Sequence, residues 1–384
     1  MTDGLRLEVR HHLAEIEQPR WDGLADGSSF YSSYGWLRAV ERQVAGDAAY
    51  VTIWRDHELL AALPTYRVRY EPYEFYSAER YRQLFGSPDR EFLFLGGYRG
   101  YRNSILLTPT SLPERDLLVR ELVDAALRIG EQTPGTVLIF PYLTPGGKEL
   151  LRGLRDSEFV LDGVEAELVV GSGGLDGYVD RLTSDRRHKV RRELRRFAEA
   201  RWRVTHEDLH GCIDEAAVIL ANIQNKYGHG ASPNAMRRLL TTQIDGVGDG
   251  HVVIGIRDAA GELAGMSLCY FWRDHLYVRM VGFDYERLRA ADEYFNLAFY
   301  EPIRLMESRR LRCLHLGPAT LDAKVRRGAL LHPLWAGRIG PPHPPPGAPV
   351  AQIRELLEGV TLRDANVVTD EWTAIDELEL PTSR

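Results

Sequence analysis

The chain has 384 residues, enough for two ordinary domains that each bury their own core. Hydrophobic residues make up 44% and charged residues 27%, and no apolar run is long enough to cross a bilayer, so the composition is that of a globular protein outside the membrane. The net charge of −7 argues against a sequence-independent coat for nucleic acid, although it leaves room for a local basic patch.

The N-terminal segment and the cysteines both indicate the compartment. The first residues contain no apolar core of a secretory signal, so we expect a cytoplasmic protein. The scattered residues Cys212, Cys269 and Cys313 have no paired spacing, which favours a reducing compartment and argues against a structural zinc. We therefore expect no bound metal and no resident cofactor.

The first half of the chain predicts alternating helices and strands. A helix is expected at 28–45, after capping serines, and two strands at 49–68 are joined by a turn at Asp56–His57. The glycine-bearing stretch at 92–103 is more typical of a tight strand end than of a backbone approach to a ligand. The remaining expected elements are a helix at 113–129, a strand at 136–142 and a short helix at 148–155.

The second half repeats this order, which suggests a duplicated domain. Residues 251–271 again predict two strands joined by an Arg-Asp turn, and a third strand, a helix and a fourth strand follow. The glycine-rich segment 171–177 has the composition of a linker. We therefore predict domains at 1–170 and 171–336, the second with the active site, and a proline-rich segment with an acidic tail at 337–384.

A strongly basic helix is expected directly after the linker. It starts at Ser184 or Asp185, and Val190, Leu194 and Phe197 form its apolar stripe. The rest of its surface is nearly all cationic and includes Arg187, Arg191 and Arg195. Two interpretations carry equal weight: a solvated helix face, or a site for the phosphates of a donor.

A second helix breaks at Gly228–Gly230 and restarts at Ser232–Pro233. Lys226 and Tyr227 precede the break and are candidate substrate-binding residues. His229 stands between two glycines and is a candidate mobile acid or base, since histidine titrates near neutral pH. A turn residue is the more common role for such a histidine.

Residues 276–328 predict a strand, a helix and a second strand, and the rest of the chain is interpreted around them. Glu293, Asn296 and Tyr300 fall at i, i+3 and i+7, on one face of the helix. The strand offers Tyr277 and Arg279, which line a cleft or cover the rim of the sheet, and Lys324 lies in the loop after the second strand. A cleft with an acid, an amide, phenols and cations suits acyl or phosphoryl chemistry.

These pieces resemble, in order and spacing, the FemAB-like branch of the GNAT acyltransferases over residues 28–335. The matching motifs are SSFYSSYGWLRAVE, DRRHKVRRELRRF, LYVRMVG, EYFNLAFYEPI and AKVRRG. The resemblance implies a mixed α/β fold of two tandem GNAT-like domains, each a mostly antiparallel central sheet flanked by helices. It also implies transfer of an activated acyl or aminoacyl group to an amine.

The resemblance suggests roles for the candidate catalytic residues. Glu293 would accept the proton of the amine; its alternative is an ion pair with Arg279 or Arg289. Lys324 would stabilise the tetrahedral oxyanion or bind a phosphate, and its alternative is an exposed loop lysine. For Asn296 and Tyr300, a packed and satisfied polar pair is favoured over a chemical role.

One departure from the family bears on the donor. GNATs that use acetyl-CoA hold its pyrophosphate on the backbone N–H groups of a glycine-rich loop before the helix, but here that place reads DYERLRAADEYF, without glycine. We therefore favour aminoacyl-tRNA over acyl-CoA as donor. The acceptor would be a small amine of a specialised metabolite or a cell-wall precursor. The competing hypothesis is a double-GNAT protein that only binds RNA or a partner.

Overall fold

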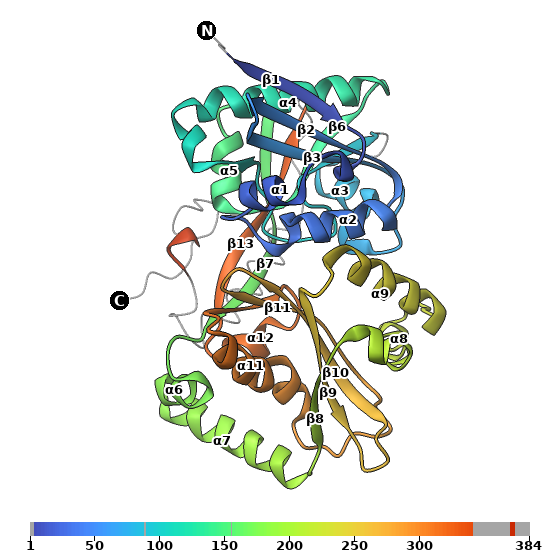
Figure 1. Ribbon diagram of the computed structural model, residues 1–384, viewed down its shortest axis with the longest axis vertical. Helices are drawn as coiled ribbons and strands as arrows, with labels where there is room; N and C mark the ends of the chain where they lie inside the picture. Colours follow the sequence, from blue (N-terminus) through green and yellow to red (C-terminus); the bar gives the residue numbers. More distant parts are fainter. Residues whose placement is uncertain (1–3, 88–89, 155, 341–368, 373–384) are drawn as a thin grey trace. The chain divides into compact units, whose positions relative to one another are not determined.

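The computed structural model describes residues 4–87, 90–154, 156–340 and 369–372, which form two compact units (Figure 1). Unit 1 is formed by the residues up to Val164 with 333–340 and 370–372, and unit 2 by Glu165–His332 with Thr369. Within the described residues, no helix combines the length and the apolar character needed to cross a membrane.

Unit 1 is a mixed sheet with the strand order β1-β2-β3-β4-β6-β13, and β5 pairs with β3. All neighbours are antiparallel except β4 and β6. The strands are β1 (Leu5–Arg10), β2 (Ala45–Arg55), β3 (Glu58–Tyr70), β4 (Phe92–Leu95), β5 (Leu106–Leu107), β6 (Val137–Leu143) and β13 (Leu330–Ile339). The α-helices are α1 (Gln18–Leu24), α2 (Tyr34–Gln43), α3 (Ala78–Leu84), α4 (Arg115–Glu131) and α5 (Pro145–Leu151).

Aromatic rings close the end of the parallel pair in unit 1. Beyond β4, Asn103 accepts from the backbone N–H of Gly97 (2.8 Å) and donates to the Pro141 carbonyl (2.7 Å). Tyr101 and Tyr142 pack edge to face, 4.9 Å between ring centroids. A Cβ at Gly97 would lie 2.4 Å from the carbonyl oxygen of Tyr31, so this glycine serves close backbone packing. The strand-end interpretation of the glycine stretch is therefore confirmed.

Unit 2 has the strand order β7-β12-β11-β10-β9-β8, with β11 and β12 as its parallel pair. The strands are β7 (Ser157–Val169), β8 (Arg203–Glu207), β9 (His251–Arg257), β10 (Leu263–Trp272), β11 (His275–Phe283) and β12 (Cys313–Gly317). The helices are α6 (Gly174–Arg181), α7 (Ser184–Glu199), α8 (Leu209–Lys226), α9 (Pro233–Val247), α10 (Glu293–Phe295), the π-helical η5 (Asn296–Tyr300), α11 (Glu301–Arg309) and α12 (Leu321–Val325). In Figure 1, α8 and α9 lie side by side.

The units repeat one order of elements but do not divide at residue 170. Strand β7 begins in unit 1 and pairs with β12 in unit 2, whereas β13 returns to pair with β6 in unit 1. Each sheet is thus completed by the last strand of the other repeat. Residues 337–339, expected in a polyproline segment, instead end β13. The proline-rich stretch from Pro341, the helix suggested at 350–357 and most of the acidic tail lie outside the described residues.

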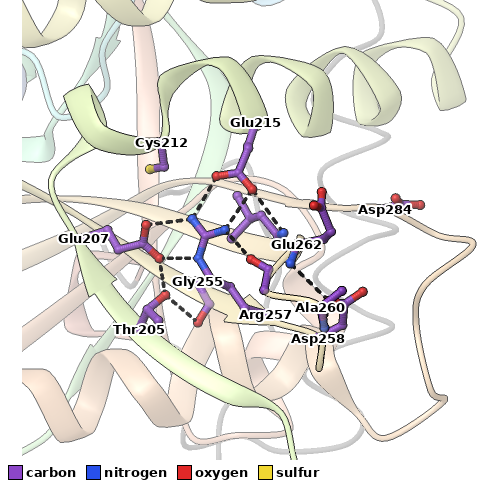
Figure 2. A network of polar contacts seen from close by, with 12 residues as sticks. Thr205, Glu207, Cys212, Glu215, Gly255, Arg257, Asp258, Ala260, Glu262 and Asp284 are labelled. Atoms are coloured by element: carbon purple, nitrogen blue, oxygen red, sulfur yellow. Dashed lines mark hydrogen bonds and ion pairs between the residues drawn. The ribbon is translucent and has the colours of Figure 1, made fainter.

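An arginine clamp fastens the edge of the sheet in unit 2 (Figure 2). Arg257 on β9 donates to both oxygens of Glu207 on β8 (2.7 Å each) and to both of Glu215 on α8 (2.8 and 2.9 Å). Its charge and hydrogen bonds lower the pKa of both carboxyls. The clamp holds β8 and α8 on β9, so this side of the sheet is braced by bidentate charged contacts.

Candidate active site

Strands β11 and β12 separate after a short parallel contact. They pair only from His275 to Tyr277 on β11 and from Cys313 to His315 on β12. Beyond Tyr277, β11 continues along β10 to Phe283, and no other described strand pairs with its second edge. Since Cys269 faces Val278 and Leu268 faces Met280, Arg279 is the extra residue of a bulge. An open strand edge with a bulge provides backbone N–H and C=O groups for a ligand.

Three polar side chains from neighbouring strands stack beside this opening. His315 Nε2 lies 2.8 Å from a carboxylate oxygen of Glu165, and both side chains are only 1% exposed. The ring of Tyr277 stacks on that of His315, 4.6 Å between centroids and 31° between planes. Tyr277 was an expected site residue, but Glu165 and His315 were not. The sequence did contain a signal for Glu165. It is a carboxylate between Val164 and Ala166, in a segment otherwise typical of a buried strand, and a buried carboxylate needs a partner.

Lys324 is buried at the end of β12. Its side chain extends from α12, and its Nζ donates to the carbonyl oxygens of Leu316 (2.5 Å) and Gly317 (2.8 Å). Burial lowers its pKa to about 7, and the charge of Glu165 partly opposes this shift. The alternative of an exposed loop lysine is wrong, because the residue is 4% exposed. Only four of the 48 basic residues are lysine, and lysine, unlike arginine, can lose its proton near neutral pH.

Stability should therefore depend on pH through Lys324. The unfolded chain keeps this proton up to the ordinary pKa of 10.5, whereas the folded chain releases it near 7. Between these values unfolding takes up a proton, so the free energy of unfolding rises with pH; this contribution is lost as the pH falls through 7. We expect the Tm of the wild type to rise relative to Lys324→Met between pH 7 and about pH 9. Equal pH profiles for the two proteins would contradict the buried amine.

Glu293 holds a loop instead of facing Lys324. Its carboxylate accepts from the backbone N–H groups of Arg289 (2.8 Å) and Ala291 (2.9 Å) and from the Trp202 indole (3.2 Å). The guanidinium of Arg289 lies over the Trp202 ring, 4.1 Å from its centroid. The carboxylate whose charge acts on Lys324 is Glu165. Glu293 and Lys324, both expected to act at the reacting carbonyl, therefore have separate partners: the Glu293 carboxylate accepts from the Arg289 and Ala291 backbone, and the Lys324 amine donates to the Leu316 and Gly317 carbonyls.

Asn296 and Tyr300 are both fully buried in the π-helical turn η5. The Tyr300 hydroxyl donates to Glu193 on α7 and accepts from Arg327 Nε (3.2 Å). Arg327 also makes a bidentate pair with Glu193 (2.8 and 2.9 Å). The structure therefore agrees with the favoured interpretation of Tyr300 as a packed polar group whose hydrogen bonds are satisfied. Asn296 donates to the Asp292 carbonyl (3.0 Å), but its Oδ1 has no partner in the described part of the chain.

The three candidates at the end of α8 lie on the surface of unit 2. Lys226 is exposed, with its Nζ 3.9 Å from the ring centroid of Tyr285. Tyr227 is 67% exposed. His229 is exposed, and its side chain makes no hydrogen bond or ion pair within the described residues. None of the three is among the hydrogen-bond partners of the buried Lys324 in the described part of the chain.

The arginines of the basic helix α7 fall into two groups, those that bond to the backbone of α6 and those that are exposed to solvent. Arg187 donates to the carbonyls of Asp180 (3.1 Å) and Leu182 (3.0 Å) and so satisfies the end of α6. Its expected phosphate contact must be corrected, because this guanidinium serves the fold. Arg191 is 60% exposed and pairs loosely with Asp180 (3.3 Å). Arg195 is exposed, and no carboxylate among the described residues pairs with it.

Residues 184–325 match the family described as acetyltransferase (GNAT) domain. No curated protein matches the sequence. Among solved structures, FemX is similar with a TM-score of 0.58 at 11% identity, covering 91% of this chain and 100% of that chain. The C-terminal domain of a putative lysylphosphatidylglycerol synthetase from Agrobacterium fabrum gives 0.54 at 11%, covering 91% and 97%. L-PGS from Bacillus licheniformis gives 0.51 at 10%, also covering 91% and 97%.

Proposed function

Since residues 184–325 match a GNAT acetyltransferase domain and the fold is similar to that of FemX, we propose that the chain is a FemAB-like acyltransferase that transfers an aminoacyl group from aminoacyl-tRNA to an amine and so forms an amide. The reaction would take place in unit 2, at the open edge of β11. Unit 1 would support unit 2, since aromatic rings fill the end of its own parallel pair. Acyl-CoA is the alternative donor.

The observation that carries the choice of donor is the carboxylate of Glu293. An acetyl-CoA site in this fold needs free backbone N–H groups in the loop before the helix, where they bind pyrophosphate. Here the N–H groups of Arg289 and Ala291 are bonded to Glu293, which is 4% exposed. A second anion there would meet both occupied donors and a fixed negative charge. This arrangement supports a donor whose phosphates bind elsewhere.

Helix α7 offers that other place. Arg191, Arg192 and Arg195 are exposed on a helix whose buried side carries Val190, Glu193 and Phe197. Exposed arginines at this spacing suit a run of phosphates along a tRNA acceptor stem, and such binding weakens as salt rises. We expect the Arg191→Ala/Arg195→Ala variant to raise KM for aminoacyl-tRNA and to reduce its salt dependence. Its kcat should stay close to that of the wild type.

The chemistry would use Lys324 at the reacting carbonyl. The amine attacks the ester carbon, a C–N bond forms, and the C–O bond to the terminal ribose of the tRNA breaks. Protonated Lys324 would stabilise the negative charge on the tetrahedral oxygen. With a pKa of about 7, the same group can also give a proton to the leaving ribose oxygen and then take up the proton that the amine nitrogen releases, so the step balances. Glu165 and His315 would position this end of β12 through their own hydrogen bond.

The acceptor is proposed by class only: the amine of a small metabolite or of a cell-wall precursor. The direct test incubates the protein with pools of tRNA charged with radiolabelled amino acids, or with acyl-CoAs, and a panel of such amines. We expect labelled amide from charged tRNA and none from acyl-CoA, with Lys324→Met as the inactive control. Turnover of acyl-CoA without turnover of charged tRNA would overturn the proposed donor.

A further inference from the structure

Three potential metal ligands meet on the sheet of unit 2, next to the stacked pair Tyr277 and His315. They are Glu167 on β7, His275 on β11 and Cys313 on β12, and their ligand atoms all lie within 4.8 Å of one another. His275 pairs in register with Cys313, and Glu167 pairs with His315 two residues further along. Strand pairing, not nearness in the sequence, therefore assembles a sulfur, a nitrogen and an oxygen.

The ring of His275 is oriented for coordination. Its Nδ1 lies 2.7 Å from the Asp274 carboxylate, so Nδ1 carries the proton and the lone pair is on Nε2. Nε2 points towards Glu167, 3.9 Å from Oε2, and no hydrogen bond reaches it from the described residues. The Cys313 sulfur lies within 4.8 Å of the ligand atoms of both Glu167 and His275. A carboxylate behind a histidine is the usual outer support of a zinc-binding imidazole.

A second group of potential metal ligands in unit 2 has a buried histidine whose ring nitrogens are both occupied. It consists of Asp208, His210 and His251. Both ring nitrogens of His251 are used by the backbone: Nδ1 lies 2.7 Å from the Gly248 carbonyl, and Nε2 accepts from the Leu209 N–H (3.1 Å). His251 therefore has no lone pair for a metal. The contrast shows that the availability of a nitrogen, and not composition alone, distinguishes the first group.

We propose that Glu167, His275 and Cys313 bind one Zn²⁺ ion, with water as the fourth ligand. A thiolate, an imidazole and a carboxylate are the ligand types that zinc accepts together. Ligand atoms around tetrahedral zinc are roughly 3.3–3.8 Å apart, as follows from its bond lengths, so small side-chain rotations suffice. Glu167 and His275 are partly exposed (12% and 28%), which leaves a route for the ion and the water.

Such an ion would brace the three strands at the start of the short β11–β12 contact, two residues before these strands separate. The ring centroids of His275 and Tyr277 are 6.0 Å apart, so the ion would lie one residue pair away from the Glu165–His315 contact. The spacing of the cysteines in the sequence argued against zinc, because it contains no paired motif. The fold replaces that motif with ligands from distant strands. The inference is independent of the acyl donor.

The test measures metal binding by the full chain under reducing conditions. Titration of the metal-free protein with Zn²⁺, in competition with a chromophoric chelator, should give one ion per chain. Co²⁺ in its place should produce a near-ultraviolet charge-transfer band, which requires a thiolate ligand. Zinc binding displaces the thiol proton of Cys313, so affinity should increase with pH.

Variants assign the ligands. Asp274→Asn should weaken zinc binding by roughly 10- to 100-fold, and His275→Gln and Cys313→Ser by more than that. Cys212→Ser and His210→Gln are the matched controls and should bind as the wild type does. If Cys313→Ser does not fold, a charge-transfer band retained in Cys212→Ser and lost in His275→Gln still supports the site. The absence of the band in the wild type, or zinc affinity unchanged in His275→Gln, overturns the proposal.

Discussion

Replacing Lys324 by methionine is expected to lower kcat for amide formation by about 100- to 1000-fold, the usual cost of removing one donor to a tetrahedral oxyanion. The substitution keeps the length of the side chain and removes the amine that donates to Leu316 and Gly317. Folding should be retained, because an uncharged side chain suits a position that is 4% exposed. Steady-state rates with charged tRNA and an amine acceptor measure the effect.

Two further substitutions make this result specific. Lys324→Arg should also be inactive near neutral pH, because a guanidinium does not lose its proton there and is larger and planar. Lys148→Met is the matched control: its Nζ lies over the Trp335 ring in unit 1, 3.3 Å from the centroid, and we expect an unchanged rate. A Lys324→Met rate within tenfold of the wild type would show that this amine does not act at the carbonyl.

Replacing Arg327 by methionine is expected to lower the free energy of unfolding by about 3–5 kcal/mol, the usual cost of breaking a buried ion pair by removing one partner. The Arg327 and Glu193 side chains are 2% and 3% exposed, and Arg327 also donates to the Tyr300 hydroxyl. The variant leaves the carboxylate of Glu193 buried without its cation. Urea unfolding of the wild type and the variant gives the difference.

The neighbouring residue supplies the control for this prediction. Arg326 pairs with Asp322 on the surface (2.9 Å, side chains 48% and 51% exposed), so Arg326→Met should cost no more than about 1 kcal/mol. Glu193→Gln combined with Arg327→Met should recover part of the lost stability, since no buried charge is then left alone. An equal loss in Arg326→Met and Arg327→Met would mean that burial does not set the strength of this pair.

Helix α7 shows which features of an element can be predicted from the sequence and which cannot. Its position and its apolar residues Val190 and Phe197 follow from helical periodicity, and the structure agrees. Glu193 falls in the same stripe but was not expected to be buried, because its partner Arg327 lies 134 residues away. The exposed arginines could be recognised, but the internal role of Arg187 at the end of α6 could not.

The candidate site shows the same division. The order of motifs placed Tyr277 and Lys324 near the site, because strand and loop types can be read locally. Glu293 was expected as a proton acceptor or in an ion pair with Arg279 or Arg289, since the sequence does not show that its carboxylate turns back to the backbone of its own loop. Glu165 was missed because its contact with His315 joins strands 150 residues apart.

The sequence by itself determined the kinds of element, their duplicated order and the basic surface of one helix, since these depend on neighbours within a turn or along one strand. Only the tertiary structure decided that β7 and β13 each complete the sheet of the other repeat, that Lys324 is buried at the end of β12, and that Glu167, His275 and Cys313 meet. Strand register and long-range pairing set these contacts, and neither leaves a local trace in the chain.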